Sequence, residues 1–259
     1  MTIHRFTLDN TPIELTVTDH CNGRPVLLLH GGAGPLSVSG FAALLADRFE
    51  RRVIVPTHPG FDGTPRPETL TTIADLARLY VELLDRLELP DVTVIGNSLG
   101  GWIAAEIALL SNERVGRVVI ANAAGLDLPA TPIADFFALT MDEVADLSYC
   151  HSDAFRIDMN SLPPQRLATI AGNRATLQTY GGTAMTDPTL LDRLPAITTP
   201  TLITWGQCDR MIPLTHATAY ANAIPGARLE IISDAGHLPQ SESPDTLARL
   251  VIEFDGSAG

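Results

Sequence analysis

The sequence has few cysteines, a shortage of basic residues and no long hydrophobic run. Three cysteines, Cys21, Cys150 and Cys208, are far apart in the 259 residues and form no CxxC pair. Their number and spacing predict neither a disulfide framework nor a zinc site, and they suit a reducing compartment. The longest apolar run beside a predicted strand is VLLL, and the N-terminus has no apolar stretch typical of a signal peptide. We therefore expect a cytoplasmic protein that does not span a membrane.

The charge balance narrows the range of partners. The chain has 17 basic and 30 acidic residues, a formal net charge of −13. Such a protein repels nucleic acids and anionic lipids, so we expect neither as a partner. The expected partner is a small-molecule substrate. No sequence pattern calls for a cofactor or a metal, and the oligomeric state stays open.

Alternating strand and helix patterns dominate the chain. After an N-terminal hairpin pattern, short apolar runs such as PVLLLHGG, RRVIVP, VTVIGNS and VGRVVIANAAG are followed later by PTLITWGQ and ARLEIIS. Helical periodicity is found between them, at 38–49, 71–88, 99–112, 214–224 and 244–254. This alternation predicts an α/β fold: a doubly wound, mostly parallel sheet with helices on both faces.

One region interrupts the alternation. Residues 127–194 contain no convincing strand pattern, and segments such as TPIADFFALTMDEVADLSYC read as helical. We therefore predict a core domain formed by residues 1–126 and 195–259, with residues 127–194 as a helical insertion.

A strand runs directly into a helix through a serine. The sequence VTVIGNSLGGWIAAEIAL contains Gly96-Asn97-Ser98-Leu99-Gly100, which fits G-x-S-x-G between an apolar strand and a helix. The two glycines allow strand and helix to approach closely, and the sharp turn exposes the serine hydroxyl at the sheet edge. This context predicts that Ser98 is a nucleophile.

A serine hydroxyl needs a general base, and the base needs an acid to orient it. His237 follows the strand pattern LEIIS in a loop before the last helix, and Asp209 follows the strand pattern TLITW. We predict that these two residues complete a triad with Ser98. Asp234 is the competing acid, and Asn122, at the other strand end where an acid might stand, has no carboxylate.

Backbone donors are predicted near Ser98. The segment His30-Gly31-Gly32-Ala33-Gly34 follows the strand VLLL, and glycine allows such a turn to present its N–H groups. We expect the N–H groups of Gly32 and Leu99 to form an oxyanion hole, with Ala33 next to it. For His30 we expect a bracing role.

The segments HGGAGP, HPGFDGT, GNSLGG, WGQCDRMIP and SDAGHLPQSESP, in this order, resemble the α/β-hydrolase superfamily over about residues 1–255. The resemblance implies a serine hydrolase that acts through an acyl-enzyme, with residues 127–194 as a cap over the pocket. It is specific for fold and triad but not for substrate. The leading interpretation is an esterase for a small to medium, mainly apolar substrate.

Two alternatives remain open. The GNS segment is similar to that of carbon–carbon bond hydrolases of meta-cleavage pathways, which implies that Asn97 lines the pocket and that Arg174 binds a substrate carboxylate. Those enzymes usually have an aromatic residue after the histidine, whereas this chain has Leu238. For Arg174, a solvated helix position is the competing interpretation. The second alternative is a ligand receptor on the same fold that turns over slowly or not at all.

Overall fold

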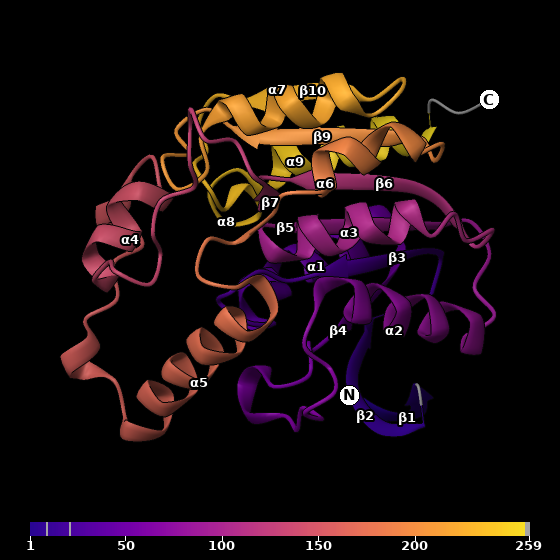
Figure 1. The fold of residues 1–259 in the computed structure, drawn as a ribbon, viewed down its shortest axis with the longest axis horizontal. Helices are drawn as coiled ribbons and strands as arrows, with labels where there is room; N and C mark the ends of the chain where they lie inside the picture. Colours follow the sequence, from indigo (N-terminus) through magenta and orange to yellow (C-terminus); the bar gives the residue numbers. More distant parts are fainter. Residues whose placement is uncertain (9, 21, 257–259) are drawn as a thin grey trace.

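The computed structural model describes residues 1–8, 10–20 and 22–256, which fold around an eight-stranded sheet (Figure 1). Its strand order is β1-β2-β4-β3-β5-β6-β9-β10. The strands are β1 (Thr2–Leu8), β2 (Thr11–His20), β3 (Arg24–Leu29), β4 (Arg51–Pro56), β5 (Val92–Asn97), β6 (Val115–Ala121), β9 (Thr201–Gly206) and β10 (Arg228–Ile232). β2 pairs antiparallel with β1 and β4, and all pairs from β4 to β10 are parallel. The predicted mostly parallel α/β sheet is confirmed.

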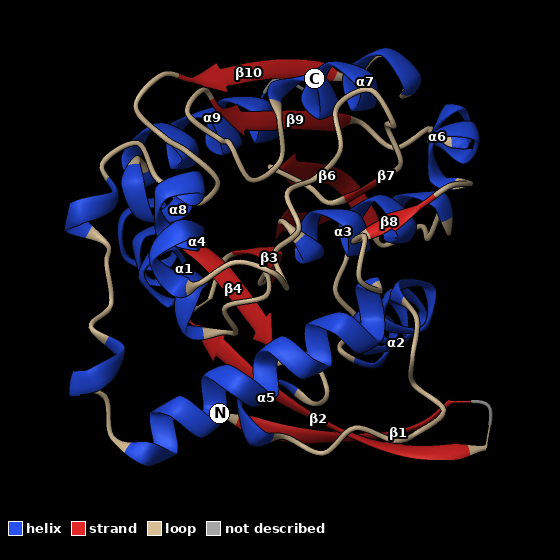
Figure 2. Ribbon diagram, turned by 60° about the vertical axis from the view of Figure 1, so that its left-hand side comes forward, coloured by secondary structure: helices blue, strands red, loops and turns tan. Residues whose placement is uncertain are grey.

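Helices cover both faces of the sheet (Figures 1 and 2). One layer consists of α1 (Leu36–Phe49), α8 (Pro239–Glu242) and α9 (Pro244–Gly256), and the other of α2 (Ile73–Arg86), α3 (Leu99–Leu109) and α7 (Leu214–Ala223). Consecutive residues of β3 face opposite layers: Val26 and Leu28 pack into one apolar cluster, Leu27 and Leu29 into the other. This two-sided burial explains why the central strands are apolar throughout. Among the described residues, no helix is long and apolar enough to cross a membrane.

The start of α2 illustrates how local sequence sets an element boundary. Thr72 accepts a hydrogen bond from the backbone N–H of Asp75, and the Asp75 carboxylate accepts one from the backbone N–H of Thr72. This reciprocal capping satisfies two donors that the first turn would otherwise leave unpaired. The helix predicted over 71–88 therefore begins at Ile73, directly after its cap Thr72.

Most of residues 127–194 lies beyond the carboxyl ends of the parallel strands, whereas the end of this segment packs against the layer of α3 and α7 (Figure 1). They contain α4 (Met141–Ser148), α5 (Pro164–Gly181), α6 (Leu190–Arg193) and short 3-10 turns that include Ser152–Ala154 and Met159–Ser161. The expectation that this region lacks a strand is wrong at one place, because β8 (Thr186–Asp187) pairs with β7 (Gly125–Leu126). Two residues are too few to produce a period-2 pattern in the sequence.

The prediction that the cysteines form no disulfide is wrong for two of them. Cys150, just after α4, is bonded to Cys208, just before Asp209, with 5.3 Å between their Cα atoms. Cys208 is half-exposed. The third cysteine, Cys21, lies outside the described residues. The bond links the helical region over 127–194 to the loop that follows β9.

Candidate active site

Ser98 stands at a sharp turn between β5 and α3. Its backbone has φ 57° and ψ −117°, a conformation that side-chain-bearing residues rarely adopt. A Cβ at Gly96 would overlap with the carbonyl of Gly100, and a Cβ at Gly100 would overlap with the carbonyl of Leu29. Glycine at both positions is therefore required for this turn, which holds the serine side chain beyond the end of the sheet.

His237 and Asp209 form a buried pair behind the serine. The Nδ1–H of His237 donates to Oδ2 of Asp209 at 2.9 Å. The other carboxylate oxygen accepts the backbone N–H groups of Met211 and Ile212, both at 2.9 Å. This contact assigns the histidine tautomer that leaves Nε2 free to accept a proton. The competing acid Asp234 is exposed at the surface.

Asn122 completes the surroundings of the carboxylate. Its Nδ2 donates to Oδ2 of Asp209 at 2.7 Å and to the carbonyl of Gly236 at 3.2 Å, and its Oδ1 accepts the N–H of Gly206 at 3.3 Å. Oδ2 of Asp209 thus accepts from both Asn122 and His237. The sequence excluded Asn122 as an acid but did not indicate that it contacts the acid, since that follows only from the adjacency of β6 and β9.

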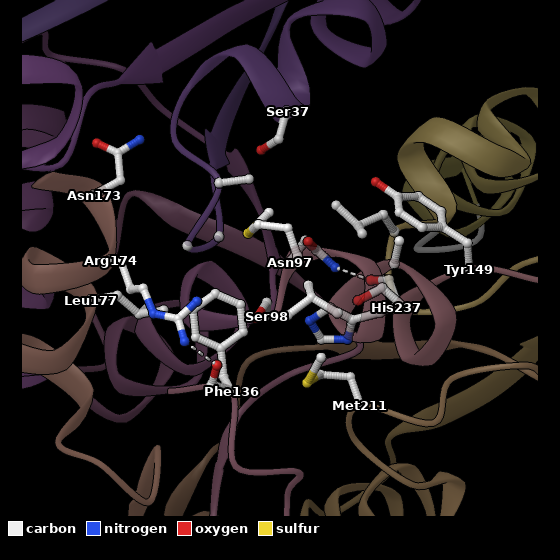
Figure 3. A pocket seen from close by; sticks show the side chains of 18 of the residues that line it. Ser37, Asn97, Ser98, Phe136, Tyr149, Asn173, Arg174, Leu177, Met211 and His237 are labelled. Atoms are coloured by element: carbon white, nitrogen blue, oxygen red, sulfur yellow. Dashed lines mark hydrogen bonds between the residues drawn. The ribbon is translucent and has the colours of Figure 1, made fainter. Parts of the chain in front are cut away.

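Ser98 and His237 both line one cavity of about 210 Å³ (Figure 3). The structure also brings Gly32, Ala33 and Asn97 to its wall, and Leu99 begins α3 directly after the serine. The remaining wall is largely apolar and comes mostly from the helical region: Ile133, Phe136, Met141, Val144, Ala145, Tyr149, Phe155, Ile157, Ile170, Leu177, Met185, Met211, Ile212 and Leu238. In the described part of the chain, no group of three or more His, Cys, Asp or Glu side chains is arranged to hold a metal ion.

The glycine-rich turn after β3 is held by two buried histidines that contact each other. The rings of His30 and His58 lie 3.7 Å apart, and both residues are fully buried. His30 Nδ1 donates to Gly31 O at 2.8 Å, and His30 Nε2 accepts the backbone N–H of His58 at 3.1 Å. In return, His58 Nε2 donates to His30 O at 2.8 Å, and His58 Nδ1 is hydrogen-bonded to the hydroxyl of Tyr80. Burial lowers the pKa of His30 to about 4, and burial together with His30 lowers that of His58 well below its usual value. The expected bracing role of His30 agrees with this geometry.

Asn97 lines the cavity, but its amide is already bonded to protein groups. Its Nδ2 donates to the carbonyl of His237 at 2.9 Å, and its Oδ1 accepts from Nε2 of Gln240 at 3.1 Å (Figure 3). Asn97 therefore ties the turn that carries Ser98 to the loop that carries His237. Its position at the cavity wall fits the prediction, but these contacts compete with any bond to a substrate.

Arg174 also lines the cavity and is likewise engaged. Its Nη2 donates to the carbonyls of Phe136 at 2.8 Å and Leu139 at 3.2 Å. The guanidinium lies over the ring of Phe136, 4.8 Å from its centroid, and 5.8 Å from that of Phe137 (Figure 3). Arg174 thus holds the segment before α4 against α5. It is half-buried, so the solvated helix position that competed with a binding role does not describe it.

Arg166 is a cavity residue that was not predicted from the sequence, although its helical spacing is visible there. Arg166 lines the cavity together with Ile170, Asn173 and Leu177. These four residues of α5 are spaced by four, three and four positions, which places them on one helix face. The spacing is visible in PPQRLATIAGNRATLQTY, but the apolar periodicity of this segment is too weak to predict which helix face lines a cavity.

Comparisons with known proteins agree with this architecture. Residues 26–250 match the family described as "Alpha/beta hydrolase family". A 2-hydroxymuconate semialdehyde hydrolase of Pseudomonas putida is 30% identical, over 91% of this chain and 88% of its own. A 2-hydroxy-6-oxo-6-phenylhexa-2,4-dienoate hydrolase of Burkholderia cepacia is 28% identical, over 98% and 94%.

Solved structures extend the similarity to esterases. An esterase from Thermogutta terrifontis superposes with a TM-score of 0.78 at 25% identity, covering 98% of both chains. A meta-cleavage product hydrolase from Pseudomonas fluorescens superposes with a TM-score of 0.75 at 25% identity, covering 99% of this chain and 98% of its own. With a family match over most of its length and this fold, the chain belongs to the alpha/beta hydrolase family.

Proposed function

We propose that the protein is a serine hydrolase that cleaves a carboxylic ester of a small to medium, largely apolar substrate. One observation supports this proposal most directly: Ser98 and His237 line the same cavity, whose other walls are largely apolar. Such walls exclude water and favour an apolar acyl group next to the nucleophile. Arg174, which binds a substrate carboxylate in the alternative of a carbon–carbon bond hydrolase, is bonded here to backbone carbonyls.

In the first half of the reaction, Ser98 Oγ attacks the ester carbonyl carbon while Nε2 of His237 takes its proton. The Asp209 carboxylate, which accepts the Nδ1–H of His237, stabilises the imidazolium that forms. The carbonyl oxygen becomes an oxyanion, and the N–H groups of Gly32 and Leu99 are the proposed donors to it. The tetrahedral intermediate then expels the alkoxide, which takes the proton from His237.

In the second half, water replaces the alcohol. His237 removes a proton from a water molecule, the resulting hydroxide attacks the acyl carbon, and the same donors hold the oxyanion. The bond to Ser98 Oγ breaks, and the serine regains its proton from His237. The products are the carboxylic acid and the alcohol, and the enzyme is unchanged.

A carbon–carbon bond hydrolase is the second candidate, because relatives at 27–30% identity carry such names. Those names describe dienoate or semialdehyde substrates. The engaged amide of Asn97 and the engaged guanidinium of Arg174 favour the ester. A panel of p-nitrophenyl esters assayed beside a 2-hydroxy-6-oxo-dienoate separates the two candidates by their values of kcat/KM.

The nucleophile is tested with an alkyl fluorophosphonate. We expect one label per chain on the wild type and none on Ser98→Ala. Labelling of another serine in that variant contradicts the proposal. Steady turnover of p-nitrophenyl acetate supports an enzyme, whereas a stoichiometric burst without turnover supports the receptor alternative.

The proposed triad is tested by combining substitutions. Ser98→Ala and His237→Ala should each reduce kcat by several orders of magnitude, and the double variant should be little worse than either, because both residues serve one proton transfer. Losses that multiply in the double variant contradict a shared step.

A further inference from the structure

One face of α5 forms a long side of the cavity. Leu177 lies at the end near the nucleophile, because a Cβ at Gly32 would be 2.7 Å from its Cδ2. Asn173, one turn earlier, lies against Gly34 in the same way, because a Cβ at Gly34 would be 2.8 Å from Nδ2 of Asn173. Arg166 lies about three turns before Leu177, or about 16 Å along the helix axis. The cavity therefore extends from the proposed oxyanion hole along α5 to Arg166.

The cavity is open to solvent at its Arg166 end. Ile157, which also lines it, is 47% exposed, and the Arg166 side chain is 36% exposed. The walls between this end and Ser98 include the apolar side chains of Ile170 and Phe155. An unbranched chain that starts at Ser98 and follows α5 thus meets mainly apolar surface before it reaches the guanidinium of Arg166. The two polar residues beside this path, Asn173 and Arg174, are bonded to backbone groups of the protein.

Arg166 and Arg174 both line the cavity but differ in what they can bind. The guanidinium of Arg174 is bonded to two backbone carbonyls and stacked on Phe136. The guanidinium of Arg166 has an ionic partner in Asp62 among the described residues. Nη1 of Arg166 lies 4.0 Å from Oδ1 of Asp62, which is beyond hydrogen-bond distance. Arg166 therefore keeps donors for a ligand.

The local field also favours an anion at this end. Arg166 lies in the first turn of α5, a helix of 18 residues, and that turn contains no acidic residue. The positive end of the helix dipole adds to the guanidinium charge. A single planar guanidinium matches a carboxylate, which it can bind through two parallel hydrogen bonds.

We propose that Arg166 forms an anion subsite at the mouth of the cavity, and that the substrates are esters with a carboxylate at the far end of an apolar chain. This inference rests on the proposed ester hydrolysis and adds to it the substrate class. The subsite is about three helix turns from the oxyanion-hole contact, so it selects for chain length as well as charge. Asp62 weakens the binding of a carboxylate at this subsite, because the ligand competes with the Asp62 side chain for Arg166.

The test compares two series of substrates. Methyl half-esters of unbranched dicarboxylic acids, from succinic to sebacic acid, are assayed beside methyl esters of monocarboxylic acids of equal length, and kcat/KM is measured by acid release. We expect the wild type to favour the longer half-esters over their neutral counterparts. Arg166→Gln should lower kcat/KM for the longer half-esters about fivefold, as expected for a partly exposed charge pair, and leave the neutral esters unchanged.

Two further variants sharpen the comparison. Asp62→Asn should raise kcat/KM for the same half-esters, because it removes the competing carboxylate. Arg249→Gln changes an exposed arginine of α9 that does not line the cavity, so both series should stay at the wild-type level. An equal effect of Arg166→Gln on both series, or an effect on neither, overturns the subsite.

The proposed function and the subsite can fail separately. Hydrolysis of the neutral methyl esters tests the function alone. Binding of free suberate to the wild type and to Arg166→Gln, measured by calorimetry, tests the subsite without turnover. Weaker binding by the variant supports it, and equal affinity refutes it.

Discussion

Asn122 Nδ2 donates a hydrogen bond of 2.7 Å to Oδ2 of Asp209, the same oxygen that receives the Nδ1–H of His237. The buried carboxylate has four donors in total, since its other oxygen accepts two backbone N–H groups. Because donors reach both oxygens from different sides, the carboxylate of Asp209 is held in one orientation toward the histidine.

The first prediction concerns this contact. Asn122→Leu, which preserves size but removes the amide, should lower kcat about 10- to 100-fold with little change in KM, because a charge-assisted hydrogen bond contributes about 1.5–3 kcal/mol. Asn122→Asp should be more damaging, because two adjacent carboxylates resist joint ionisation. Steady-state kinetics on a neutral ester measure both effects. A kcat for Asn122→Leu equal to that of the wild type would show that Asp209 does not need this donor.

The second prediction uses the bond between Cys150 and Cys208. It closes a loop over a sequence separation of 58, and chain-entropy arguments give such a bond a stabilisation of about 4 kcal/mol. Dithiothreitol should therefore lower the free energy of unfolding of the wild type in urea titrations. For Cys150→Ala, the free energy of unfolding should already be lower without the reductant and should not change when the reductant is added. An unchanged wild type under reducing conditions would contradict a stabilising bond.

The third prediction is a fall in stability between about pH 6.5 and about pH 4. In the folded protein, burial lowers the pKa of His30 to about 4, whereas an unfolded histidine titrates near its usual value of 6.5. In this window His30 binds a proton in the unfolded chain but not in the folded one. The free energy of unfolding therefore drops as pH falls, by up to about 3 kcal/mol for His30. His58, with its lowered pKa, adds to the same trend.

Urea titrations across this pH range check that prediction. His30→Asn should show a smaller pH dependence than the wild type, although its stability at neutral pH is lower. His151→Gln, which changes an exposed histidine, should retain the wild-type pH dependence. A wild-type slope in His30→Asn would show that this buried ring is not a source of the effect.

The sequence predicted those features that depend on local chemistry. The turn at Ser98 could be read because glycines on both sides are the only residues that fit between β5, α3 and β3. The position of Asp209 after a strand and of His237 after the next strand indicated a common sheet edge. Their contact at 2.9 Å agrees with that prediction, while the catalytic roles await the experiments above.

Features that depend on long-range packing could not be read. The bond between Cys150 and Cys208 requires that the end of α4 reach the loop after β9, which no local pattern encodes. For the same reason the sequence could not tell which arginine of α5 is free. The guanidinium of Arg174 contacts carbonyls before α4, whereas that of Arg166 lies near Asp62, and both contacts come from distant parts of the sequence.

The last prediction follows from that difference. Arg174 holds the carbonyls of Phe136 and Leu139 and stacks on the ring of Phe136, so its guanidinium maintains a cavity wall. Arg174→Leu should lower kcat/KM about tenfold for a neutral p-nitrophenyl ester and by the same factor for a dienone acid, because the lost contacts to carbonyls and ring affect the wall that every substrate meets. Arg174→Lys keeps the charge but lacks the planar group that stacks on an aromatic ring, so its kcat/KM should fall between those of the wild type and Arg174→Leu. A loss confined to the dienone acid would instead show that Arg174 binds a substrate carboxylate, and would make carbon–carbon bond hydrolysis the better description of the enzyme.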